Sequence, residues 1–378
     1  MTYRYKTMEY SRRLIPYFFV LTLGVMTIFA RYKYNGLIYG FDYGLYQPDG
    51  MHYTYRALDL LNHNPEQSAQ QVSDWYKSNS FKAKNISIAD LIPETSPVYY
   101  YISHRILYPL LSIPFVYMFG IPGMLVVPSI AFLVLLFVVL RICSSYKLMY
   151  IGVTICLVLS ISPTVTRWMV SNTTDALLVG LFSYSIILLK DFSFHSKTAY
   201  IQIPTLILLT SATRFSLVFW IAIGLVLFLN REKLLSICII FIASICSIPA
   251  LKASLGVALL PNSKEQTTFE KIFSLPASFC KVLFVDVAQL AVLDRALLAF
   301  LLFGVFLALL QFKNIVNQYF LAMLFAGYIL GAVNGVLGVN FRYQLPVIPF
   351  CAWTIVSSIN LMKSKPNLFS FLQSHIKT

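Results

Sequence analysis

Long apolar runs separated by short polar segments dominate this chain. They fall at residues 14–30, 121–140, 148–163, 174–189, 199–213, 215–230, 234–251, 286–310, 317–338 and 344–362. A helix needs about 20 apolar residues to cross the roughly 30 Å hydrocarbon core of a bilayer. The pattern therefore predicts an all-α, polytopic integral membrane protein with about ten transmembrane helices. Because no polar block of domain size interrupts the runs, we expect one integral membrane domain over residues 1–378.

An eleventh apolar run, at 106–119, is shorter than the others. It contains Pro109 and Pro114 and ends at Gly120, which suits a re-entrant or interfacial helix better than a full span. Short cytoplasmic loops are rich in Lys and Arg. Omitting this run from the spans (ten spans rather than eleven) places both termini and the Lys- and Arg-bearing short loops on the cytoplasmic side. We expect a multi-pass protein of the inner (plasma) membrane with cytoplasmic termini.

Composition supports the membrane prediction and excludes a nucleic-acid partner. Hydrophobic residues make up 58% of the chain and charged residues 12%, against about 25% charged residues in soluble domains. The formal charge of +14 comes from Lys and Arg scattered in ones and twos between apolar runs, not from a polar face that could follow a phosphate backbone. The six cysteines show no metal-binding spacing and are expected to be inert.

The longest polar segment is the predicted first extracytoplasmic loop, 31–105, which contains a plausible amphipathic helix at 53–61. Just before this helix, Pro48-Asp49-Gly50 has the composition of a turn. Asp49 has a second interpretation, because an acid at the bilayer face can act as a general base on an arriving substrate. Asp42 and His52 lie close to it in the sequence.

Further charges lie near the predicted outer ends of spans. The pair His104-Arg105 precedes the short apolar run and either anchors it at the headgroups or supplies a guanidinium for phosphate. Asp175 either pairs with Arg167 across a turn or has a functional role, since charges at membrane depth are functional candidates. Neither Arg214 nor Arg342 has an acidic neighbour in sequence. If these arginines converge near Asp49, they form an anion site suited to a lipid-linked phosphate.

Two motifs carry a resemblance to a known family. The segment Asp49-Gly50-x-x-Tyr53-x-x-x-Ala57-Leu58-Asp59 resembles a signature in the first external loop of bacterial multi-span proteins assigned to cell-surface glycopolymer formation, which are similar to glycosyltransferases of the GT-C type. The segment from His104 to Leu111 resembles a second element of that loop. The family commonly has an acid after the Thr-Arg pair, whereas Phe215 follows Arg214 here.

The resemblance implies a GT-C-like fold and sugar transfer from a polyprenyl-phosphate donor to a cell-surface glycan or lipid acceptor on the extracytoplasmic side of the membrane. Asp49 would be the base that deprotonates the acceptor hydroxyl. The expected substrate-binding residues are Asp42, His52, Tyr53, His104, Arg105, Asp175, Arg214 and Arg342.

Two other functions remain open from the residues alone. A surface-polysaccharide polymerase or ligase (for example of O-antigen) also joins lipid-linked sugars through external arginines, but usually carries its largest external loop late in the chain. A flippase or transporter is expected to show matched halves with broken helices, and no internal repeat is evident. No cofactor is predicted. Asp42 and Asp49 could bind a divalent cation, but two carboxylates are too few to define a metal site.

Overall fold

The computed structural model describes residues 2–39, 48–79, 91, 104–190, 197–252, 274–334 and 341–364. Within these ranges every regular element is a helix, which confirms the all-α prediction. The elements are α1 (Thr2–Tyr39), α2 (Pro48–Asn62), α3 (Pro65–Asn79), α5 (Leu107–Phe119), η2 (Ile121–Leu125), α6 (Val126–Ser145), α7 (Met149–Ile161), α8 (Pro163–Met169), α9 (Asp175–Lys190), α10 (Lys197–Thr213), α11 (Leu217–Leu229), α12 (Lys233–Cys246), α15 (Leu275–Leu293), α16 (Arg295–Leu310), α17 (Ile315–Asn334), η3 (Arg342–Val347) and α18 (Ile348–Ser364).

Many of these helices have the length and composition of membrane spans. Among the described residues, 5 helices are long and apolar enough to cross a bilayer, and the bent pair α7 and α8 would make a sixth. The shorter apolar helices are α5, α10, α11, α12 and α16. Large apolar side chains such as Phe18, Tyr150 and Phe284 are exposed on the outer surface of the bundle, as expected for side chains that face lipid. The chain is therefore a membrane protein built from packed helices.

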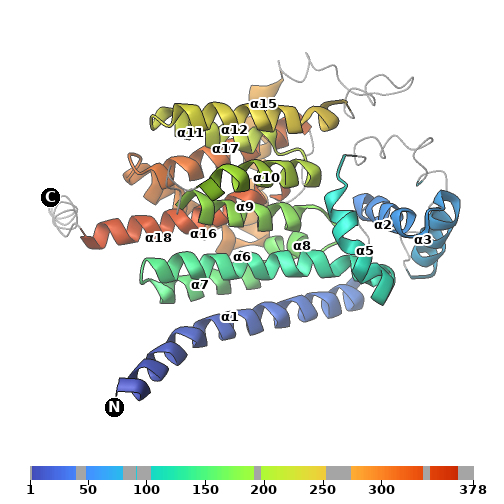
Figure 1. Ribbon diagram of the computed structural model, residues 1–378, viewed down its shortest axis with the longest axis horizontal. Helices are drawn as coiled ribbons and strands as arrows, with labels where there is room; N and C mark the ends of the chain where they lie inside the picture. The colour runs from blue at the N-terminus through green and yellow to red at the C-terminus, as the bar shows by residue number, and fades with distance from the viewer. Residues whose placement is uncertain are drawn as a thin grey trace.

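The two ends of the bundle differ (Figure 1). The N-terminal end of α1 and the C-terminal end of α18 lie at the left of the view, whereas α2, α3 and α5 lie at the right. We call the right-hand end the α2 end. Both described chain ends thus lie on the side of the bundle opposite α2, α3 and α5.

The apolar run at 286–310, expected to form a single span, is divided into α15 and α16, and that expectation was wrong. Asp294 separates the two helices, and its carboxylate accepts a hydrogen bond from the Leu297 N–H at 3.1 Å, which caps α16. The same carboxylate accepts from the Ser162 hydroxyl and from the Thr164 N–H at the start of α8. One buried acid therefore caps two helices, and α15 begins at Leu275, before the start of the predicted run.

The short run at 106–119 forms α5, a helix of 13 residues and therefore about 20 Å long, too short to span a bilayer unaided. The chain reverses at Gly120, whose φ of +67° suits glycine. Gly123 then lies so close to α5 that a Cβ would come within 2.2 Å of the Phe115 carbonyl oxygen. Glycine is therefore required where α5 turns into η2.

The first loop is more helical than its sequence indicated. Pro48, Asp49 and Gly50 form the first turn of α2 and not a separate turn, and the polar stretch that follows contains α3. The predicted amphipathic helix at 53–61 lies inside α2, and its apolar face is buried in a second core with α3 and α5 that includes Tyr53, Tyr55, Leu58, Tyr76 and Tyr108. This packing fixes the start of α2, and hence Asp49, relative to the membrane helices.

Candidate functional site

Five charged side chains from distant parts of the chain meet at the α2 end. Asp49 lies in the first turn of α2, Arg105 just before α5, and Asp175 at the first position of α9. Arg214 lies between α10 and α11, and Arg342 begins η3. We call these five residues the charged cluster. Their assembly depends on the complete helix bundle, since no two of them are neighbours in sequence.

Arg342 joins the two carboxylates of the cluster. Its Nη2 lies 2.9 Å from Oδ2 of Asp49 and its Nε lies 2.8 Å from Oδ2 of Asp175. Arg214 forms an ion pair with the other oxygen of Asp175. Arg105 Nη1 donates to the Tyr53 hydroxyl at 2.8 Å and lies 3.8 Å from Oδ2 of Asp49. The two acids are thus held by shared guanidinium groups.

Aromatic rings cover the flat faces of two guanidinium groups. The Arg342 guanidinium carbon lies 4.7 Å from the ring centroid of Trp168, and that of Arg214 lies 4.7 Å from Tyr343. A cation over an aromatic face is attracted by the ring quadrupole. These contacts fix the plane of each guanidinium while leaving its edges free to form hydrogen bonds.

Burial divides the cluster into a deep part and an accessible part. Side-chain exposure is 2% for Asp175 and 6% for Arg214, compared with 28% for Asp49 and 13% for Arg342. Asp175 and Arg214 therefore form the buried part of the charged cluster. Asp49 is the carboxylate that a ligand reaches first. Three guanidinium groups against two carboxylates leave one excess positive charge, which favours an anionic ligand.

The titrating groups outside the membrane helices respond to this field. Burial alone would raise the pKa of Asp49, but Arg342, Arg105 and Arg214 outweigh it and lower the pKa to about 2. The carboxylate is therefore ionised above that value, and its ion pairs are lost only as the pH falls through it. Burial, together with Arg105 and Arg214, lowers the pKa of His104 to about 3. His104 is consequently a neutral imidazole at pH 7.

Asn172, which lies between α8 and α9, connects the core formed by α2, α3 and α5 to the membrane helices. Its amide nitrogen donates to the Gly50 carbonyl at 2.9 Å and to Oγ1 of Thr54 at 3.0 Å, and its oxygen accepts from the Tyr108 hydroxyl at 2.7 Å. Gly50 allows this approach, because a Cβ there would come within 2.7 Å of the Asn172 carbonyl oxygen. The Asn172-Thr173-Thr174 triplet matches a glycosylation sequon in the sequence, but the side chain is fully buried and has a positioning role.

We expect Asn172→Ala to lower the free energy of unfolding by about 1–3 kcal/mol, because it removes the hydrogen bonds that buried groups of α2 and α5 form with the Asn172 amide. Thermal unfolding of the purified protein in detergent measures this loss. Asn62→Ala, at the exposed end of α2, is the matched control and should change the midpoint little. Equal effects of the two substitutions would contradict a positioning role for Asn172.

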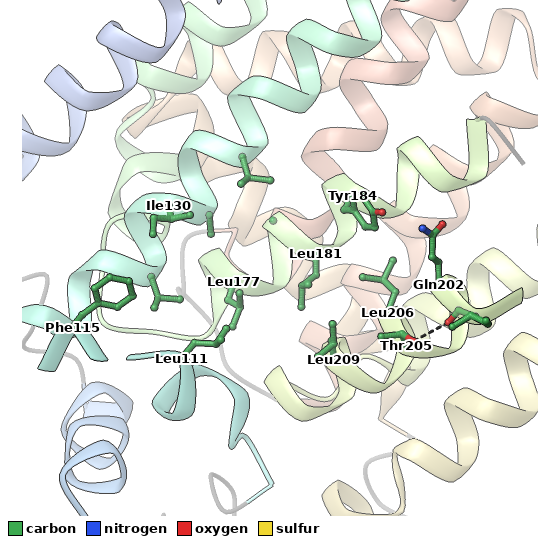
Figure 2. A pocket seen from close by; sticks show the side chains of 15 residues that line it. Leu111, Phe115, Ile130, Leu177, Leu181, Tyr184, Gln202, Thr205, Leu206 and Leu209 are labelled. Carbon is green, nitrogen blue, oxygen red and sulfur yellow. Dashed lines mark hydrogen bonds between the residues drawn. The ribbon is translucent and has the colours of Figure 1, made fainter. Parts of the chain in front are cut away.

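An apolar groove opens on the side of the bundle between α5, α6, α9 and α10 (Figure 2). It has a volume of about 620 Å³ and is lined by Leu111, Phe115, Ile130, Leu177, Leu181 and Leu206 among others. Figure 2 shows these side chains directed into one shared space, with Tyr184 and Gln202 toward one end. Several lining residues are exposed, including Leu111 and Ile130. The groove is therefore open to lipid and suited to a hydrocarbon chain.

The groove and the charged cluster lie on opposite faces of α9. Leu177, Leu181 and Tyr184 face the groove, whereas Asp175 and Leu178 border a small hollow beside Arg214. Leu177 follows Asp175 by two positions, which is about 3 Å along the helix axis. A lipid in the groove would thus bring its headgroup over the N-terminus of α9, where free backbone N–H groups and the helix dipole favour anions.

The structure brings together six of the residues expected to form the site: Asp49, Tyr53, Arg105, Asp175, Arg214 and Arg342. His104 lies close enough to Arg105 and Arg214 for both charges to lower its pKa. His52 is buried in α2 at 7% exposure, and Asp42 lies outside the described residues. For Asp175, the ion pairs that the structure shows are with Arg214 and Arg342, while Arg167 lies over the ring of Trp168.

Within the described ranges, no group of three or more His, Cys, Asp and Glu side chains is placed to hold a metal ion. Comparisons of the chain with protein-family models, with curated proteins and with solved structures found no match.

Proposed function

We propose that this protein is a membrane glycosyltransferase of the GT-C type that takes a sugar from a polyprenyl-phosphate donor. The acceptor is a cell-surface glycan or lipid, and the α2 end faces the extracytoplasmic side. The observation that carries the proposal is the position of Asp49 among Arg105, Arg214 and Arg342, in a cluster that includes the first residue of α9, while the other face of the same helix lines a lipid-accessible groove. A carboxylate beside an anion site is what transfer from a phosphate-linked sugar requires.

The reaction is a single displacement with inversion at the anomeric carbon. Asp49 accepts the proton of the acceptor hydroxyl, whose oxygen forms a bond to the anomeric carbon. The bond from that carbon to the phosphate oxygen breaks, and the prenyl phosphate leaves with the electron pair. Arg105 and Arg342 stabilise the charge that develops on the leaving phosphate. Neutral His104 is available for hydrogen bonds to the sugar or the phosphate.

Ten crossings account for the arrangement of the helices in this proposal. The crossing helices are α1, α6, α7, α9, α10, α11, α12, α16, α17 and α18. The bond between Asp294 and Ser162 places the end of α15 beside the end of α7, which lies on the extracytoplasmic side in this order of crossings. We therefore assign α15 as a helix that enters and leaves on one side. An even number of crossings places both termini on the same side, and this side is cytoplasmic because the α2 end is proposed to be extracytoplasmic.

The assay that tests this function compares membranes from cells with and without the protein, supplied with polyprenyl-phosphate-linked labelled sugars. Label should appear in the surface glycan or lipid only in membranes that contain the protein. Transport of the lipid-linked sugar without any new glycosidic product would contradict a transferase and indicate a flippase.

We expect Leu181→Trp to raise the KM for a long-chain polyprenyl donor by about tenfold, because the added ring fills part of the groove. The effect on a donor with a short prenyl chain should be small, since that chain does not need the groove. Steady-state kinetics with the two donors measure the difference. Leu302→Trp, at an exposed position of α16, is the control. Equal changes for both donors would contradict the groove as the binding site of the lipid chain.

A further inference from the structure

In the structure described here, the charged cluster is neutralised largely by its own carboxylates. The Asp49 oxygen that lies 2.9 Å from Arg342 Nη2 is the same oxygen that lies 3.8 Å from Arg105 Nη1. Two of the three cations that a phosphate could use are therefore directed at the group assigned as the base. A carboxylate that shares its charge with two guanidinium groups is a poor proton acceptor.

We propose that Asp49 is a competing internal anion, displaced from Arg342 and Arg105 by the phosphate of the lipid donor, so that donor binding releases the base. This inference rests on the proposed function and adds an order of events to it: the donor phosphate binds before the acceptor hydroxyl is deprotonated. The recognised chemistry is a phosphate monoester or diester carried on a prenyl chain.

Three features of the cluster support an exchange of partners. Asp49 is the more exposed of the two acids: its side chain is 28% exposed and that of Asp175 is 2% exposed. Asp175 therefore stays paired with Arg214 during the exchange. Arg342 is oriented independently of Asp49, because Asp175 holds its Nε and Trp168 covers its face. Arg105 is held by Tyr53, and its buried Nε has no hydrogen-bond partner among the described residues. Both arginines therefore keep their places when Asp49 leaves.

The experiment measures the affinity of the full-length protein, in detergent, for farnesyl phosphate. Because Asp49 competes with the phosphate, Asp49→Asn should bind this probe at least fivefold more tightly than the wild type. Asp74→Asn, on neighbouring α3, where the carboxylate accepts from Gln70, should leave the affinity unchanged. Farnesol and inorganic phosphate separate the contributions of the chain and of the anion: the gain should appear with both phosphates and be absent with farnesol. Weaker or unchanged phosphate binding by Asp49→Asn would overturn the proposal.

A second experiment uses the wild-type protein, so its result does not depend on whether a variant folds. Hydrogen exchange with added farnesyl phosphate should become faster in the first turn of α2 and slower in η3, because α2 loses its bond to Arg342 while the arginine gains a ligand. Slower exchange in both segments would contradict the exchange of partners. Tighter phosphate binding by Asp49→Asn without any sugar transfer by the wild type would refute the proposed function alone.

Discussion

Asp49→Asn is expected to lower the rate of sugar transfer by about 10²- to 10⁴-fold, the usual contribution of a general base. The amide keeps the shape of the side chain and its place in the first turn of α2, but it cannot accept the proton of the acceptor hydroxyl. The loss should appear in kcat, because donor binding depends on the arginines and on the groove. Initial rates with a labelled polyprenyl-phosphate sugar measure it.

The control for this prediction is Asp74→Asn, the same chemical change on α3, which should retain full activity. Circular dichroism and the elution volume in detergent establish that both variants remain folded. Product formation by Asp49→Asn at the wild-type rate would show that Asp49 is only a helix-start residue. The assignment of the base would then be wrong.

Asp175→Asn is expected to cause the largest loss of stability, about 3–5 kcal/mol. Asp175 carries the negative charge that compensates Arg214 and Arg342, and removing one partner of a buried ion pair leaves uncompensated charge in a region of low dielectric constant. The protein should unfold at a much lower temperature or fail to elute as a single species. Thermal unfolding in detergent at constant pH measures the change.

A second buried acid provides the matched control. Asp286 has 3% exposure, but its described partner is the Phe341 N–H at 3.4 Å and not an arginine. An amide can accept that hydrogen bond as well as a carboxylate can, so Asp286→Asn should cost less than about 1 kcal/mol. Similar losses for both substitutions would show that burial alone, and not the pairing with arginine, explains the effect.

The fold was predictable where local composition decides it. The length of the 106–119 run and its closing glycine indicated a short helix, and α5 has these properties. The break at Asp294 was missed because hydropathy averages over a single Asp-Arg pair. The acid acts there as a cap for α8, which lies far away in sequence, and this contact exists only in the folded bundle. Helix α3 was missed because its apolar face packs on other parts of the same loop.

The site was predictable as a set of residue types but not as a network. Arginines near the outer ends of apolar runs, together with Asp49, indicated an anion site, and the structure brings these side chains together. Pairing of Asp175 with Arg214 and Arg342 depends on how α9, α10 and η3 pack, which no local pattern encodes. Asn172 was missed as well. The sequence shows only that it matches a glycosylation sequon, whereas its hydrogen bonds to Gly50, Thr54 and Tyr108 exist only in the folded protein.

Chemistry on a lipid-linked phosphate is the central claim, and release of the leaving group tests it most directly. Purified protein in proteoliposomes should release free polyprenyl phosphate from a polyprenyl-phosphate-linked sugar in step with formation of a glycosidic product, and should release nothing from a nucleotide sugar. Product formation from the nucleotide sugar, or intact lipid-linked donor after prolonged incubation with acceptor present, would contradict the account.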